Sequence, residues 1–255
     1  MATKAPAKAV SKSTAVAVKK PTSGALVSIR EQLAAQAADT ASRTAPPTGS
    51  KVQLKGGKFK FPDGTETAGP VRLVIVDFVT THAYYPGKFD ANNIQPPECF
   101  AIGTNPKAML PSPHSPNIQA KDCQTCQQNQ FESSGKGKAC KNGRKLAVLP
   151  PGADADTPIW TMDVSPTAIK GFDAYVQSVA RMFQTPPVGV VTTVAFDDTV
   201  DYTKLVFSNP EPNEDLEVCF GRQEEARTTL ETEPDVSGYQ APAGKKPLRT
   251  PVKAR

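Results

Sequence analysis

Four cysteines within 42 positions constrain this chain more than any other feature of its sequence. Cys99, Cys123, Cys126 and Cys140 follow the spacing C-x23-C-x2-C-x13-C. A CxxC turn lets two thiolates reach one metal ion, and two more distant cysteines can complete the tetrahedron. The pattern predicts a structural Zn²⁺ ion held by these four cysteines, in a subdomain at about 97–149.

Other cysteine chemistries remain as alternatives. An iron–sulfur cluster uses the same four thiolates, and unbound thiols are the simplest case. A disulfide framework is disfavoured because nothing in the sequence points to secretion. A thioredoxin-like pair needs a CxxC that opens a helix within a βαβ pattern, which is not predicted. His114 is a substitute ligand candidate, although the prolines around it suit an exposed loop, and Cys219 is interpreted as a plain small residue.

Charge divides the chain into blocks. Residues 1–50 hold seven basic and two acidic residues, residues 211–235 hold nine acids and two arginines, and residues 245–255 hold five bases. Blocks of one sign are typical of solvated segments, and residues 1–25 are too poor in large apolar side chains to form a core. We predict a disordered basic segment over 1–50, with a weak helix at Leu26–Ala38, and a disordered acidic-then-basic tail over 209–255.

The sequence has no membrane or export signal that we recognise. No stretch approaches the ~18 consecutive apolar residues of a membrane helix, and the first twenty residues lack the apolar region of a secretory signal. We therefore expect a soluble, cytoplasmic protein.

Between these ends, residues 51–208 carry the folding signals. Val71–Val79 is rich in β-branched residues and is the strongest strand candidate, followed by 145–149, 159–164, 188–196 and 204–207. One helix is predicted from Ser165, an N-cap, with Ile169, Phe172, Val176, Val179 and Phe183 on one face. The pattern predicts a mainly β or α+β domain, a small β-barrel with one packed helix.

Catalysis is not favoured. Four cysteine ligands leave no open position on a zinc ion, and the chain has only two histidines. Asp77, Asp90 and Glu98 could hold Mg²⁺ in a nuclease-like site, but their spacing matches no known motif. No phosphate-cradling GxxxxGK[ST] loop is present.

Basic residues surround the last metal-ligand candidate: Lys136, Lys138, Lys141, Arg144 and Lys145, with glycines between them. They could offset the charge of −2 that four thiolates on one Zn²⁺ leave. Alternatively, they form a basic knuckle along a phosphate backbone, with glycines that permit close approach.

The segments PPECFAIG and GKGKACKNGRKLAVL, on either side of the CxxC, resemble the zinc-containing single-stranded-DNA-binding proteins of tailed phages. The likeness covers roughly 52–207 and is most specific over 96–149. It implies an OB-fold barrel with a zinc subdomain inserted in it. Two features depart from that family. Its familiar member uses a mixed cysteine–histidine site, whereas this chain offers four cysteines. Such proteins also usually end in an acidic tail, whereas the acidic segment here is followed by basic residues.

This resemblance implies non-catalytic, sequence-tolerant binding of single-stranded DNA in replication or recombination, in the host cytoplasm if a phage encodes the protein. OB-type sites pair a positive groove with aromatic platforms for bases, although core packing is the alternative for each aromatic. Besides the basic cluster, the candidates are Lys58, Phe59, Lys60, Phe61, Arg72, Tyr84, Tyr85, Lys88 and Phe89. Replication or recombination proteins are expected partners of the acidic 211–235 segment. The alternative function is a zinc module that grips a protein partner or regulates transcription, and a metal-dependent nuclease comes after it.

Overall fold

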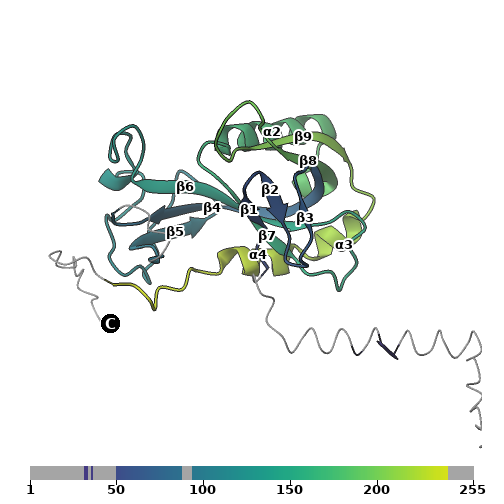
Figure 1. Ribbon diagram of the computed structural model, residues 1–255, viewed down its shortest axis with the longest axis horizontal. Coiled ribbons are helices and arrows are strands. Elements are labelled where there is room, and N and C mark those ends of the chain that lie inside the picture. The colour runs from purple at the N-terminus through teal and green to yellow at the C-terminus, as the bar shows by residue number, and fades with distance from the viewer. Residues whose placement is uncertain (1–31, 34–35, 37–49, 88–93, 241–255) are drawn as a thin grey trace, which may run out of the picture. The chain divides into compact units, whose positions relative to one another are not determined.

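The computed structural model describes residues 32, 33, 36, 50–87 and 94–240 of a chain that divides into two units, Met1–Pro46 and Pro47–Arg255. In the first unit, residues 32, 33 and 36 are helical, within the helix predicted at Leu26–Ala38. The disorder predicted for the rest of 1–50 and for 241–255 falls outside the described residues. The second unit holds the strands and helices described below (Figure 1).

A six-stranded antiparallel sheet forms the centre of this unit. Its main path runs β7-β6-β4-β8-β9, and β5 pairs with the second half of β4. The strands are β4 (Val71–Tyr84), β5 (Cys99–Gly103), β6 (Cys140–Leu149), β7 (Trp160–Val164), β8 (Val190–Phe196) and β9 (Leu205–Pro212). The five predicted strands are confirmed, and most of them are longer than predicted.

Strand β4 organises the sheet because it is 14 residues long and pairs with three others. Its first half lies beside β8, its second half lies beside β5, and β6 follows it from Val74 to Tyr84. Because the sheet is covered on both faces, the first six residues of β4 are nearly all apolar and do not alternate with polar ones. A register shift between Ile75 and Asp77 marks a β-bulge, which bends the strand.

Helix α2 (Ile169–Phe183) covers one face of the sheet. It buries Phe172, Tyr175 and Val179, and the Phe172 ring packs edge-on against Phe78 at 5.1 Å between centroids. The predicted helix is confirmed, but its first turn begins later than expected. Ala168, and not Ser165, is its N-cap, and no side chain caps it.

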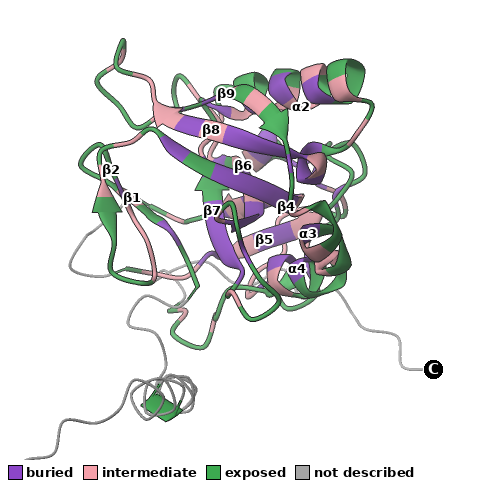
Figure 2. Cartoon of the chain, turned by 90° about the vertical axis from the view of Figure 1, so that its right-hand side faces the viewer, coloured by how far each residue is buried: buried purple, intermediate pink, exposed green. Residues whose placement is uncertain are grey.

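A small three-stranded sheet packs on the same face. Its strands are β1 (Gln53–Lys55), β2 (Lys58–Lys60) and β3 (Glu66–Thr67). The Phe59 ring is fully buried and lies 4.4 Å from that of Phe196, while the Phe61 ring lies 5.1 Å from that of Trp160. Its aromatics therefore contact β8 on one side and β7 on the other. Figure 2 shows that much of the large sheet is buried.

The opposite face is covered by a segment that the sequence predicted to be disordered. After the short η2 (Pro187–Gly189) and β9, the chain forms α3 (Leu216–Gly221) and α4 (Gln223–Glu231). Cys219, Ala226 and Leu230 are fully buried there against Val74 and Leu149 of the sheet. The disordered tail predicted from residue 209 is thus wrong as far as residue 240, because a few small and apolar side chains hold an otherwise acidic segment in place.

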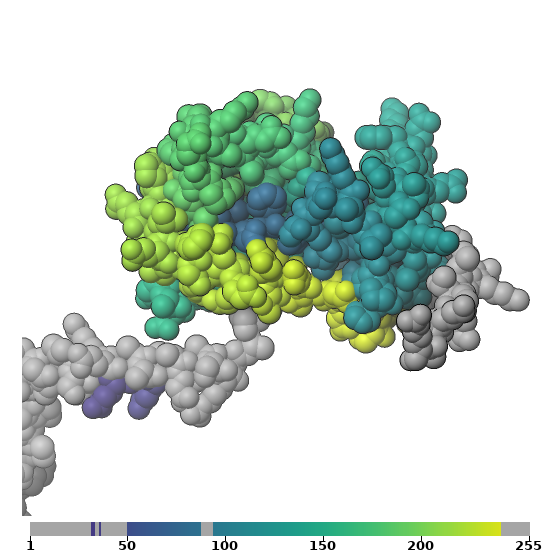
Figure 3. Space-filling model, turned by 180° about the vertical axis from the view of Figure 1, so that it is seen from behind, coloured from purple at the N-terminus to yellow at the C-terminus, as the bar shows by residue number. Residues whose placement is uncertain are grey.

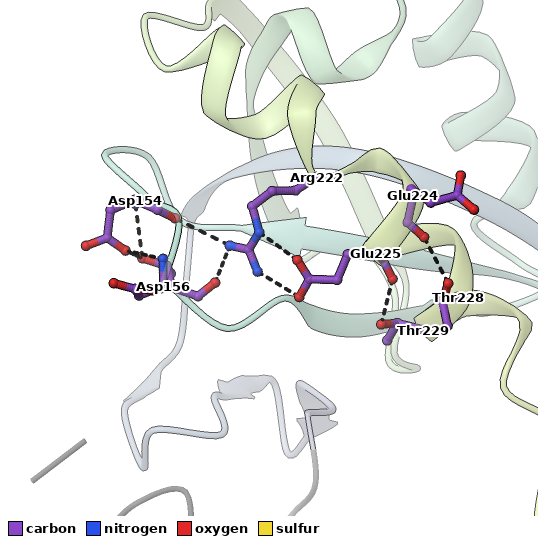
Figure 4. Close-up of polar contacts among 8 residues, drawn as sticks. Asp154, Asp156, Arg222, Glu224, Glu225, Thr228 and Thr229 are labelled. Carbon is purple, nitrogen blue, oxygen red and sulfur yellow. Dashed lines mark hydrogen bonds and ion pairs between the residues drawn. The ribbon is translucent and has the colours of Figure 1, made fainter. Parts of the chain in front are cut away.

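Arg222 fastens α4 to the loop that precedes β7 (Figure 4). Its Nε and Nη2 atoms each donate to the Glu225 carboxylate at 2.8 Å. Its Nη1 atom donates to the carbonyl oxygens of Thr157 and, at 3.4 Å, Asp154. One planar cation therefore holds two segments that are about 65 residues apart in the chain.

The fold is mainly β with few helices, an α+β arrangement, as predicted. Among the described strands, β5, β7 and β9 each pair with a single neighbour, so the sheet is not closed into the small barrel that the sequence predicted. Part of the β7 edge is covered, because Val52 donates its N–H to the Thr161 carbonyl at 2.8 Å. The folded domain runs from about residue 50 to 240 and not to 208.

Candidate nucleic-acid interface and cysteine cluster

Strand β4 brings two of the four cysteines to the same end of the sheet. Tyr84 pairs with Cys99 on β5 and with Cys140 on β6. Residues directly opposite each other in an antiparallel sheet point to the same face. The three side chains therefore share one face. Figure 1 shows this end of β4, β5 and β6 extending away from α2 and β8.

The CxxC pair lies in the connection between β5 and β6, next to the 3-10 turn η1 (Gln127–Asn129). Cys123 donates its N–H to the Met109 carbonyl at 3.0 Å. The Asn129 side chain donates to the Cys123 carbonyl at 2.7 Å, and its N–H donates to the Cys126 carbonyl at 3.0 Å. We call residues 97–140, which carry all four cysteines, the cysteine module.

The four thiols form one electrostatic cluster. The pKa of Cys123 and of Cys140 is raised to about 12. Burial is the larger cause, and the neighbouring cysteines add to it. Burial also raises the pKa of Cys99, and Cys126 adds to that effect. Each of the six cysteine pairs shows this mutual effect on pKa, so the four thiols are near neighbours electrostatically. In the described part of the chain, however, no group of three or more histidine, cysteine, aspartate or glutamate side chains has the arrangement of a metal site.

The two other residues weighed with this cluster have separate places. The His114 Nδ1 atom lies 2.6 Å from the Glu233 carboxylate, and its side chain is 73% exposed. Cys219 belongs to α3 and is buried against the other face of the sheet. The donor set is therefore the four predicted sulfurs, a combination that suits Zn²⁺ or an iron–sulfur cluster.

A groove of about 1050 Å³ separates the cysteine module from α2. The module contributes Phe131 and Lys138, β6 contributes Lys141, and α2 contributes Lys170 from its first turn. Tyr202, in the loop between β8 and β9, also lines it. Segments far apart in the sequence thus meet around one groove.

The groove has an excess of positive charge. Asp173 is its lining carboxylate, and Arg144 beneath it donates to both carboxylate oxygens, at 3.2 and 2.8 Å. Among the described residues, Lys138, Lys141 and Lys170 form no ion pair with a carboxylate. An anion in the groove therefore meets three cations and one carboxylate that is already neutralised.

Two large aromatic rings are exposed in the groove. Phe131 is 77% exposed and Tyr202 is 50% exposed. The Lys138 Nζ atom lies 5.3 Å from the centre of the Phe131 ring, within cation–π range. Neither aromatic was predicted as a site residue. Phe131 could have been found, since it is the only aromatic residue between Phe100 and Trp160. Tyr202 and Lys170 carry no comparable signal.

Several predicted binding residues need correction because they have other partners. Phe59 is in the core and offers no ring face to a base. Arg144 is buried beside Asp173. Lys145 donates to the carbonyls of Thr229, Leu230 and Thr232 at 3.2–3.3 Å, so it caps the C-terminal end of α4. These three residues support the fold instead of a ligand.

The remaining predicted residues are divided among different surfaces. Lys138 and Lys141 line the groove, Lys136 is exposed on the module, and Tyr85 is exposed beside the buried Tyr84. Lys58, Lys60 and the half-buried Phe61 belong to the small sheet, where Lys60 pairs with Glu66. Arg72 pairs with Glu211 on β9. Lys88 and Phe89 are outside the described residues.

The nuclease candidates do not share a partner. The Asp77 carboxylate lies 3.7 Å from the Arg227 guanidinium of α4. Glu98 is buried and accepts hydrogen bonds from the side chains of Asn117 and Gln119. Asp90 falls outside the described residues.

Comparison with models of known protein families gave no match, and neither did comparisons with curated proteins or with solved structures. None of the helices in the described ranges is long and apolar enough to span a membrane.

Proposed function

We propose that this protein binds single-stranded DNA, without catalysis and with little dependence on base sequence. The groove carries this proposal, because it combines two exposed aromatic rings, Phe131 and Tyr202, with three lysines that form no ion pair with a carboxylate in the described ranges. Bases stack on aromatic rings whatever their identity, while lysines follow the phosphates. Replication or recombination, where single strands are exposed, is the proposed setting.

The order of the strands supports an OB-like interpretation of the fold. Strands β4, β6 and β7 form an antiparallel meander, α2 follows, and β8 returns to pair with β4 before β9. The OB-fold is a partly open five-stranded Greek-key barrel that binds nucleic acid with the loops after its first and fourth strands. The corresponding connections here, between β4 and β6 and between β8 and β9, contribute Phe131 and Tyr202 to the groove.

A structural zinc ion is the second part of the proposal. Cys99, Cys123, Cys126 and Cys140 would hold it, because four clustered sulfurs suit closed tetrahedral coordination. When bound, the ion would cross-link the strand ends to the CxxC turn and leave no open position for water. Lys138 already lowers the pKa of Cys140, although burial outweighs it, so this lysine lies close enough to offset thiolate charge. The ion would thus fix one wall of the groove.

The folded acidic surface offers a site for partner proteins, as proposed from the sequence. Residues 211–235 form the end of β9, α3, α4 and the segment after them. In Figure 3 this segment runs along one side of the domain to the module, and Ser112 and His114 both contact Glu233. A replication or recombination protein would therefore meet an ordered surface.

Fluorescence anisotropy with oligo-dT, duplex DNA and RNA at two salt concentrations tests the proposed function. We expect tight binding to oligo-dT and weaker binding at higher salt. Phe131→Ala and Tyr202→Ala should each weaken binding about tenfold, the size of one lost stacking contact. Phe220→Ala is the matched control, since this ring is 59% exposed on α3, away from the groove.

Each rival predicts a different result. Equal affinity for duplex DNA, or no binding to any nucleic acid, would instead favour a zinc module that grips a protein or regulates transcription. Cleavage of the strand in Mg²⁺ would favour a nuclease. Unchanged binding by the Phe131 and Tyr202 variants would place any DNA site elsewhere on the domain.

A further inference from the structure

A second hollow, of about 980 Å³, lies beside the first residues of β6. Its lining includes Tyr84, Tyr85, Ile94, Pro96 and Pro97. It also includes Lys141, which lines the groove as well. One lysine at the start of β6 therefore borders both cavities.

The hollow differs from the groove in the surfaces that it offers. Tyr85 is 46% exposed and Ile94 is 75% exposed, so a planar ring and an aliphatic side chain are accessible. Among the described residues that line it, Lys141 is the cation and Asp235 is the carboxylate, and Asp235 accepts the Ser237 N–H at 2.8 Å. A phosphate would bind weakly here because the carboxylate repels it, whereas an uncharged, flat nucleobase can stack on Tyr85.

We propose that a single-stranded DNA molecule bound in the groove continues past Lys141 and places a further nucleobase in the hollow, against Tyr85 and Ile94. This inference rests on the proposed function and extends it. The ligand is a nucleobase of the same single strand, with the adjoining phosphate beside Lys141. The strand would then pass around the start of β6, so full affinity requires a longer oligonucleotide than the groove alone requires.

Length-dependent binding separates the two subsites. OB-type domains occupy about 4–16 nucleotides, so we compare dT4, which should fill the groove, with dT16, which should reach both cavities. Tyr85→Ala should weaken dT16 binding about tenfold and leave dT4 binding unchanged. Tyr85→Phe keeps the ring and should bind both lengths like the wild type. Phe131→Ala should weaken the binding of both lengths.

Ile94→Ala provides a second test of the hollow. This side chain is largely exposed, so its removal leaves the core intact, and thermal melting checks the fold of each variant. Selective loss of dT16 binding is again expected, with a smaller effect than that of Tyr85→Ala. If Tyr85→Ala and Ile94→Ala bind dT16 like the wild type, or if either weakens dT4 binding equally, the second subsite is wrong. The proposal that DNA binds in the groove would still be supported if Phe131→Ala weakens binding. A wild-type protein that binds neither length would overturn both proposals.

Discussion

At the scale of single residues, two neighbouring basic side chains of strand β6 have different roles. Arg144 and Lys145 are adjacent on β6, so their side chains point to opposite faces of the sheet. Arg144 reaches Asp173 on α2, and Lys145 reaches the last carbonyls of α4. The groove is left with Lys138 and Lys141 from the same basic stretch. A run of positive charge therefore contributes to the fold and to the proposed site in turn.

His82 should make stability depend on pH. It is 7% exposed on β4, and its Nδ1 atom has no hydrogen-bond partner among the residues that the structure describes. Burial, Lys138 and Arg144 lower its pKa to about 4. In the unfolded chain its pKa is near 6.5, so the unfolded state binds the proton more tightly. This contribution to stability is complete above about pH 6.5 and is lost as pH falls toward 4.

Urea denaturation at pH 7 and pH 5 measures this effect. The full shift corresponds to at most about 3 kcal/mol, of which part is lost by pH 5. His82→Gln should lose less stability than the wild type between the two pH values, because it has no proton to gain. An equal loss in both proteins would show that other groups control the acid sensitivity.

At the scale of elements, the acidic segment after β9 shows how few residues are needed to order a helix on a sheet. Leu230 is fully buried among Val79, Leu149 and their neighbours, whereas Leu216 on α3 is 42% exposed. Leu230→Ala should lower the free energy of unfolding by about 2–5 kcal/mol, since it leaves a cavity in the core. Leu216→Ala should cost less than about 1 kcal/mol. Equal costs in urea denaturation would mean that α4 does not stabilise the sheet.

The cysteine module is a second element whose order we expect to depend on one ion. Elemental analysis of the purified protein should give about one zinc per chain. Cys140→Ser should lose most of the zinc and lower the melting temperature, because one ligand is gone. Cys219→Ser, the matched control, should keep the zinc, since this cysteine is buried on the opposite face. Iron with visible absorbance, or no metal in the wild type, would contradict the zinc assignment.

At the scale of the whole molecule, the sequence predicted elements better than it predicted neighbours. The β-branched run at Val71–Val79 and the apolar face from Ile169 to Phe183 are local patterns, and both elements formed as expected. The α3–α4 segment was missed because its charge conceals three buried residues spread over twelve positions. The groove was missed in part because Phe131, Lys170 and Tyr202 meet only after the chain has folded. No local pattern records such a meeting.

The charge of the whole chain leads to a last prediction, about residues 1–48. This stretch holds all seven basic residues and both acidic residues of the 1–50 segment. If those basic side chains contact phosphates beyond the groove, each contact increases the slope of log K against log salt concentration by about 0.7 for single-stranded DNA. Deleting 1–48 should therefore weaken binding to dT16 and flatten its salt dependence, measured by anisotropy between 50 and ~200 mM salt. Replacing the seven bases with glutamine, at full chain length, should reproduce the deletion. An unchanged slope in both variants would confine DNA binding to the folded domain, and an effect of the deletion alone would point to a contribution of this segment other than its charge.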